Sequence, residues 1–261
     1  MNLKTMLLAS AAALVATQAH AVDITNPFYL PAEGHFLSTT RVETTRAHYY
    51  ADRGLLDDHE ATYQASEVLS YGLTDAWSVY AGITNVFMHD EGLNNDHNFG
   101  YTLGTAYNIH ADKWLVQLDA AYNTYDPRSW YGKDNYENNR WVKMFDLGIK
   151  LGYEAGCGFT PYTTFNVNGN VDDNDRWLDY SWFVGAHKQV ENVAVDAGVR
   201  YDFSTDKGNG REEAWNAEAD VDYYLRDNVT IGAYGAYYLG GRRHHDINYD
   251  VTLGLALKAA F

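Results

Sequence analysis

Apolar and polar residues alternate along the last thirteen positions of the chain, YDVTLGLALKAAF. One face of this segment carries Tyr249, Val251, Leu253, Leu255, Leu257, Ala259 and Phe261. The residues between them are mostly small or polar. Successive side chains of a strand point to opposite faces, so the pattern predicts a β-strand with one apolar side.

The same alternation recurs along the chain at a spacing of roughly 20 residues, which is typical of strand plus connection in an all-β protein. Regular segments occur at 99–109, 114–122, 145–153, 178–186, 193–203, 215–225 and 229–239. Less regular segments lie near 34–50, 60–73, 77–88 and 159–168. With the final segment, the sequence predicts twelve strands.

The predicted connections alternate between short and long. LTDA, HADK, EAGCG, HKQVEN and RDN are short, whereas DRGLLDDH, HDEGLNNDHN and DPRSWYGKDNYENNR are longer and polar. Short turns at one end and long loops at the other, with an even number of strands, are typical of outer-membrane barrels. We therefore predict an all-β fold, a transmembrane antiparallel β-barrel of about 12 strands with short periplasmic turns and long extracellular loops.

Aromatic residues support the membrane interpretation. Tyr and Trp residues concentrate near both ends of the predicted strands, and Leu, Val, Ile and Ala lie between them. Two aromatic belts around an aliphatic band match the two interfaces and the core of a bilayer. A soluble sandwich or lipocalin-like barrel would instead carry charge on its outer face. Here the opposite face is rich in Gly, Ala, Ser and Thr, which suits a lumen.

The first 21 residues have the features of a secretory signal peptide. Lys4 precedes an apolar run, and Ala19-His20-Ala21 is a small-residue cleavage site. We predict cleavage after Ala21, export, and a barrel domain at 22–261. Removal of Lys4 leaves 18 basic and 35 acidic residues, a balance that argues against nucleic-acid binding.

The leader, the alternation, the turn YGLTDAWSV and the terminal LALKAAF resemble those of Gram-negative outer-membrane β-barrel proteins, including the small monomeric porin-like class. The terminal Phe261 resembles the signal that the barrel-assembly machinery reads. The resemblance implies outer-membrane lipid, lipopolysaccharide and that machinery as partners, and a monomer. Relatives that transport acidic sugars have an Arg-rich lumen, which this sequence does not match.

The face opposite the apolar register contains charged residues, mostly acidic, that we expect to line the lumen. They are Asp119, Asp146, Lys150, Asp179, Asp196, Arg200, Asp202, Glu218, Asp220, Asp222, Asp250 and Lys258. Glycines on the same face, such as Gly104 and Gly185, remove bulk and favour an opening. The sequence therefore predicts a passive diffusion channel for small hydrophilic solutes with a mild preference for cations. No cofactor or metal is expected.

Two alternatives remain open at this point. In one, the acids and bases pair into a network that closes the barrel, leaving a structural or surface-interaction protein. In the other, Asp/His clusters in the first and last long loops form a hydrolytic site like that of omptin-type proteases, or bind a divalent metal. The clusters are Asp57, Asp58, His59, His244, His245 and Asp246. We also expect the loop Asp126–Arg140 to narrow the mouth of the pore.

Overall fold

The computed structural model describes residues 23–49, 58–90, 96–125, 142–171, 177–206, 210–242 and 247–261. Within these ranges the chain forms twelve strands. They are β1 (Phe36–Tyr49), β2 (Asp58–Thr74), β3 (Trp77–Asp90), β4 (Asp96–Ala111), β5 (Trp114–Tyr125), β6 (Val142–Tyr153), β7 (Phe159–Asn170), β8 (Trp177–Val190), β9 (Val193–Asp206), β10 (Gly210–Arg226), β11 (Val229–Arg242) and β12 (Ile247–Ala260). The described residues contain no helix that is long and apolar enough to span a membrane.

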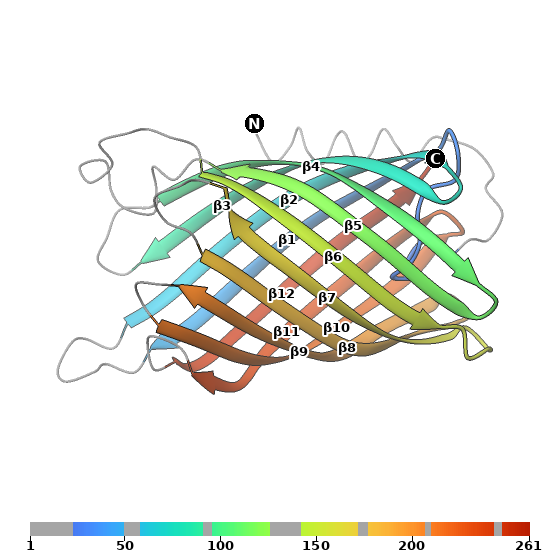
Figure 1. Cartoon of the computed structure of the whole chain (residues 1–261). Coiled ribbons are helices and arrows are strands. Elements are labelled where there is room, and N and C mark those ends of the chain that lie inside the picture. The colour runs from blue at the N-terminus through green and yellow to red at the C-terminus, as the bar shows by residue number, and fades with distance from the viewer. Residues whose placement is uncertain are drawn as a thin grey trace.

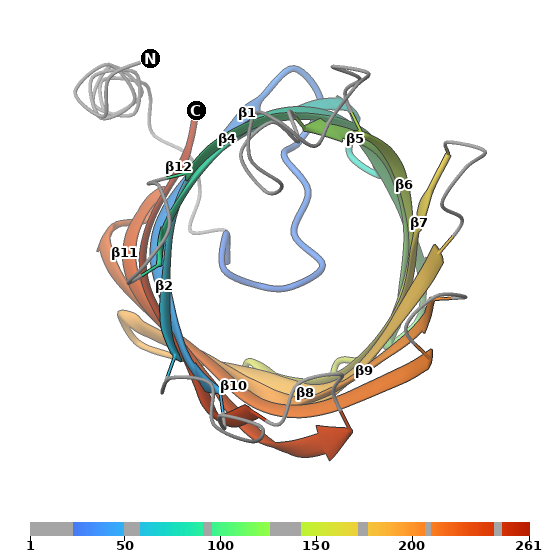
Figure 2. The same cartoon turned by 90° about the vertical axis from the view of Figure 1, so that its left-hand side faces the viewer.

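The strands form one closed antiparallel barrel (Figures 1 and 2). Each strand pairs with the next along the chain, and β1 pairs with β12. The twelve-stranded antiparallel barrel predicted from the sequence is confirmed. The short turns lie at one end, at the right in Figure 1, and the C-terminus lies at that end too.

The outer wall of the barrel is apolar and exposed, which is the reverse of a soluble protein. Leu118, Leu147 and Leu255 at its middle are 42%, 52% and 57% exposed. Trp77 and Trp114 extend from the short-turn end, and Tyr101 and Trp215 from the long-loop end. This wall matches a bilayer, in which the hydrocarbon solvates aliphatic groups and the interfaces favour indole and phenol rings.

The last residue completes the closure of the barrel. Phe36 and Phe261 exchange two backbone hydrogen bonds, with N–O distances of 2.7 and 2.9 Å. Their rings also stack, with centroids 5.7 Å apart. The terminal aromatic residue therefore belongs to the seam between β1 and β12.

The outer wall yields a test of membrane insertion. Replacing Leu147 with Arg places a charge in the hydrocarbon layer, and we expect the free energy of unfolding in lipid vesicles to fall by about 2–4 kcal/mol. Denaturant titration in vesicles measures this change. Thr164→Arg in the lumen is the control, because that side chain faces the polar interior. Equal losses for both variants would argue that this wall does not face lipid.

Candidate functional site: the lumen and its N-terminal segment

Residues 23–35, the N-terminal segment, enter the barrel at its short-turn end, where residues 23–31 lie inside it and residues 32–35 are exposed at the rim. Figure 2 shows this segment in blue within the ring of strands. Ile24 and Phe28 are each 4% exposed, and Pro31 is fully buried. Ile24 packs with Ala194 of β9 and Tyr224 of β10. The segment therefore occupies the part of the lumen that faces the predicted periplasmic side.

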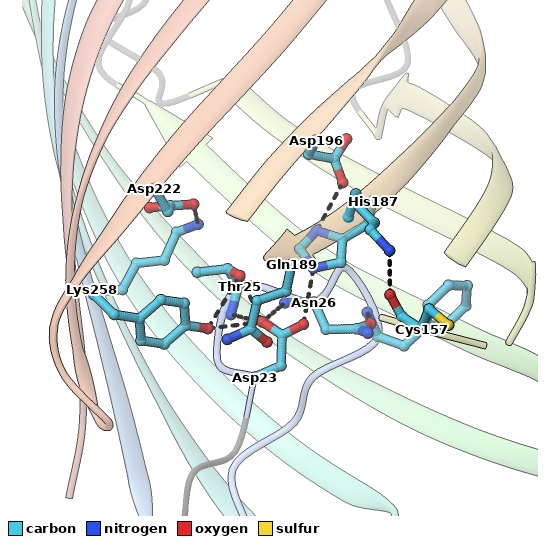
Figure 3. Close-up of polar contacts among 12 residues, drawn as sticks. Asp23, Thr25, Asn26, Cys157, His187, Gln189, Asp196, Asp222 and Lys258 are labelled. Carbon is cyan, nitrogen blue, oxygen red and sulfur yellow. Dashed lines mark hydrogen bonds and ion pairs between the residues drawn. The ribbon is translucent and has the colours of Figure 1, made fainter. Parts of the chain in front are cut away.

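Asp23 fastens the start of this segment to the wall (Figure 3). Its Oδ2 lies 2.8 Å from Nε2 of His187 in β8, a side chain only 1% exposed. The hydroxyl of Tyr224 donates to Asp23 Oδ1 at 2.7 Å, and the hydroxyl of Thr25 donates to the same oxygen at 2.6 Å. On its other side, His187 Nδ1 lies 3.7 Å from Oδ2 of Asp196.

These contacts favour the ionised form of Asp23. Burial opposes ionisation, but the hydrogen bonds from His187, Thr25 and Tyr224 and the charge of His187 outweigh it. Together they lower the pKa of Asp23 to about 2. The contact between Asp23 and the wall is therefore strongest when this carboxylate is charged.

The wall from β4 to β6 holds the middle of the segment through the segment's backbone carbonyls. Lys150 Nζ of β6 donates to the carbonyl oxygen of Pro27, and it lies 5.4 Å above the ring of Phe28. Asn108 Nδ2 of β4 donates to the carbonyl oxygen of Phe28 at 2.7 Å. Gln117 donates to Asn108 at 2.9 Å and so supports it.

Two glycines make room for the segment. A Cβ atom on Gly72 of β2 would lie 2.1 Å from the carbonyl oxygen of Ala32. A Cβ atom on Gly152 of β6 would lie 2.5 Å from the ring of Phe28. No larger residue fits at either position unless the segment moves.

The predicted lining residues all lie on the lumen side of the wall, as the strand register shows. The bases form ion pairs with some of the acids. Arg200 contacts Asp202 at 2.9 Å and Glu218 at 2.6 Å. Lys258 contacts Asp222 at 2.8 Å.

Other lumen acids are held by neutral donors. Asp146 accepts hydrogen bonds from the amides of Asn123 and Asn168. Asp119 accepts from the hydroxyl of Tyr80 at 3.0 Å. Within the described residues the acids of the lumen outnumber its bases, so the interior has a negative charge.

The sequence analysis missed several lumen residues. Arg41 and Glu43 of β1 form an ion pair of 2.9 Å, and the Arg41 guanidinium lies 3.9 Å from the ring centre of Tyr234. The irregular alternation of β1 concealed these two residues. His187 lies in a regularly alternating strand, on the same face as Asp179. This position in the alternation was enough to predict that its side chain faces the lumen.

The lumen glycines differ from expectation. They were expected to widen the interior, but large side chains occupy the space beside several of them. A Cβ on Gly104 would meet the ring of Tyr80 at 2.2 Å, and Cβ atoms on Gly185 and Gly198 would meet the ring of Phe183. These glycines accommodate aromatic rings that lie flat against the wall, so they add little open space.

A polar chamber of about 380 Å³ lies in the lumen against the N-terminal segment. Thr25 and Pro27 of the segment form part of its lining. Charged residues on the wall, including Lys150, Arg200 and Asp220, form much of the rest. Tyr162, Phe183 and Tyr234 add aromatic surface. The chamber offers both signs of charge and ring faces to a small hydrophilic molecule.

Most residues of the alternative hydrolytic site lie outside the part of the chain that the structure describes. Asp57 and the cluster His244–Asp246 lie outside the described residues, as does the predicted constriction loop Asp126–Arg140. The backbones of Asp58 and His59 belong to β2 and pair with β1. Because β1 also pairs with β12, the starts of β2 and β12 lie at the same rim.

No protein-family model and no curated protein sequence matches the chain. Solved structures do match its fold. An outer membrane channel from Pseudomonas putida F1 superposes with a TM-score of 0.68 at 14% identity, over 92% of this chain and 100% of that one. The transport unit of the autotransporter AIDA-I from Escherichia coli gives 0.54 at 12% identity, over 97% of both chains. The NanC porin gives 0.53 at 10% identity, over 84% of this chain and 98% of that one.

These similarities establish the fold. The closed twelve-stranded barrel of this chain is the fold of solved outer-membrane β-barrel proteins. The matched structures include a channel, a porin and the transport unit of an autotransporter, so the fold alone selects no single activity.

Gly72→Ala tests whether the wall is shaped for the segment. The added methyl group displaces the backbone near Ala32, so we expect faster amide hydrogen exchange across residues 23–35. Exchange mass spectrometry measures this rate. Gly235→Ala is the matched control, because its Cβ would meet only Leu253, at 3.7 Å. Unchanged exchange in Gly72→Ala would mean that the segment is not seated against Gly72.

Acid should loosen the segment through Asp23. The pKa of Asp23 falls from 3.8 in the unfolded chain to about 2 in the folded one. The ionised carboxylate therefore stabilises the segment fully at pH values above 3.8, and this stabilisation is lost as the pH falls through about 2. We expect wild type to protect residues 23–35 more than Asp23→Asn by about 2 kcal/mol above pH ~5, and almost equally near pH ~1, below both pKa values. Comparing both proteins at each pH removes the intrinsic pH dependence of exchange. A difference that does not change with pH would contradict this account.

Proposed function

We propose that this protein is an outer-membrane channel through which small hydrophilic solutes diffuse passively, with a mild preference for cations. The observation that carries the proposal is the polar chamber inside the barrel. Its wall combines charged groups with aromatic rings, and it is enclosed by strands whose outer face suits lipid. A barrel built only as a surface scaffold has no need for such an interior.

The N-terminal segment sets the width of the proposed pathway. It contacts Tyr224 of β10 and Asn108 of β4, which are six strands apart in the ring of twelve, so it crosses the lumen. Solutes would pass beside it toward the periplasm. We infer a narrow channel for small molecules.

The excess of lumen acids supports the proposed cation preference. Acids that no base neutralises leave a negative potential in a confined, low-dielectric space, which raises the local concentration of cations. Asp119 and Asp146, which are held by neutral donors, contribute most directly. The ion pairs of Arg200 and Lys258 moderate the effect, so the preference is mild.

The competing proposal is a closed barrel that conducts nothing. One observation favours it, because the N-terminal segment fills part of the lumen. In that case the protein would act through its surface. Electrical measurement on purified protein in planar bilayers separates the two. The open channel gives discrete single-channel steps, and the closed barrel gives none.

Removing residues 23–33 should raise the single-channel conductance, because the segment occupies part of the cross-section. Wild type and Gly235→Ala serve as references, since that glycine lies on the outer wall. Equal conductance with and without residues 23–33 would place the pathway elsewhere. Absence of current from both wild type and the truncated protein would overturn the channel itself.

Charge substitutions test the selectivity. Asp220→Asn should lower the ratio of cation to anion permeability, whereas Arg200→Gln should raise it by removing a positive charge from the same lumen. Reversal potentials across a salt gradient measure this ratio. Both effects should be larger at about 0.01 M salt than at about 0.1 M, where the Debye length shortens from about 30 to about 10 Å. Identical ratios in all three proteins would contradict an electrostatic filter.

A further inference from the structure

A cluster of polar side chains interrupts the lipid-facing wall on β1 and β2. Glu67 of β2 pairs in register with Thr40 of β1 and Ile83 of β3, and Thr40 in turn pairs with Leu257 of β12. These residues share the outer face. Ser38 Oγ donates to Glu67 Oε1 at 2.5 Å, and Thr40 Oγ1 donates to Oε2.

Glu67 lies at the middle of the hydrocarbon layer. The outer face of β2 reads Tyr63, Ala65, Glu67, Leu69 and Tyr71. Tyr71 belongs to the aromatic belt at the short-turn end, and Tyr63, 45% exposed, lies toward the long loops. With a strand rise of about 3.3 Å and the tilt of a barrel, the carboxylate is about 10 Å from either belt.

Two further polar side chains on the same side of the barrel have unmet hydrogen-bonding capacity. Oγ1 of Thr44 in β1 and Oδ1 of Asn85 in β3 are buried and have no partner among the described residues. Asn85 pairs in register with Ala65, one outer-face position from Glu67, so its amide lies at a similar depth. No water is available at this depth to satisfy such groups.

The threonines elsewhere on the outer wall are satisfied differently. Thr105 accepts from the indole of Trp77 at 2.6 Å and donates to the carbonyl oxygen of Ser78 at 2.9 Å. Thr163 has the same arrangement with Trp182 and Phe183. The outward threonines of β4 and β7 are thus paired, whereas the buried outer-face atoms without a partner among the described residues lie on β1 and β3.

We propose that the outer face of β1–β3, the polar face defined by Ser38, Thr40, Thr44, Glu67 and Asn85, binds the same face of a second copy of this chain within the membrane. An ionisable group within the hydrocarbon is costly and marks a functional contact. Where lipid provides no hydrophobic drive between proteins, hydrogen bonds and close packing of small residues drive association.

A second copy is the occupant that the geometry favours. Every copy inserts with its short turns on the same side, so two copies related by an axis along the membrane normal meet at equal depth. The polar face contains an acceptor, Glu67, and a donor at a similar depth, the amide nitrogen of Asn85, whereas the hydroxyls of Ser38 and Thr40 already donate to Glu67 of their own chain. It is therefore complementary to itself. Ala65 and Ala81 leave the surface shallow enough for close approach. A dimer departs from the monomer expected from the sequence.

Cysteine cross-linking in phospholipid vesicles tests the geometry. The background is Cys157→Ser, which removes the exposed native thiol. Val42→Cys, beside Ala65 on the polar face, is compared with Val199→Cys on the β9 wall. These two valines are 37% and 38% exposed, so their access to a lipid-soluble oxidant is matched. We expect disulfide-linked dimers through position 42 and not through position 199. Equal yields at both positions, or none at position 42, would overturn the proposal.

Association measurements test the chemistry. By energy transfer between labelled copies in the same vesicles, Glu67→Leu should weaken dimerisation about tenfold, in line with one or two intramembrane hydrogen bonds. Asn85→Leu should weaken it as well, and Leu147→Ala on the outer face of β6, away from the polar face, should not. Circular dichroism and heat-modified gel mobility verify that each variant is folded. Unaltered association in both Glu67→Leu and Asn85→Leu would reject the polar face as the contact.

Discussion

The hydrogen-bonded pairing of β1 with β12 is the constraint on which the rest of the structure depends. A sheet in hydrocarbon cannot leave an edge, because each unpaired backbone group costs several kcal/mol. Closure requires the two ends of the chain to meet, and Phe36 and Phe261 meet through both backbone bonds and stacked rings. Once the cylinder is closed, alternation of side chains assigns every strand residue to lipid or to lumen.

The shape of the lumen depends on how aromatic rings, glycines and the N-terminal segment pack against one another. Rings such as Tyr80 and Phe183 lie over glycines on neighbouring strand positions, which keeps them near the wall. The segment then spans the remaining width and is held by charged and amide groups at both sides. The interior therefore consists of a polar chamber beside the N-terminal segment and is not a uniform tube.

Much of the barrel was predictable because its rules are local. Period-two alternation and the unequal lengths of the connections were sufficient to predict the number of strands. They also predicted that residues such as Asp196 and Arg200 face inward. The pattern was weakest in β1, where Ser38 and Thr40 stand on the lipid-facing side. That irregularity coincides with the polar face. The site of the N-terminal segment was not predictable, since ITNPFYLP has no period and its partners His187 and Lys150 lie more than a hundred residues away.

The position of the N-terminal segment has a consequence for the order of assembly. The segment leads the barrel strands along the chain, yet it packs on residues near the other end, among them Tyr224 and Ala260. It also contacts β4 and β6, so its partners surround it on all sides only when the last strand has joined the first. The N-terminal segment, although it precedes every strand, is thus the last part of the barrel domain to reach its final position. It can dock only after the barrel has closed around it.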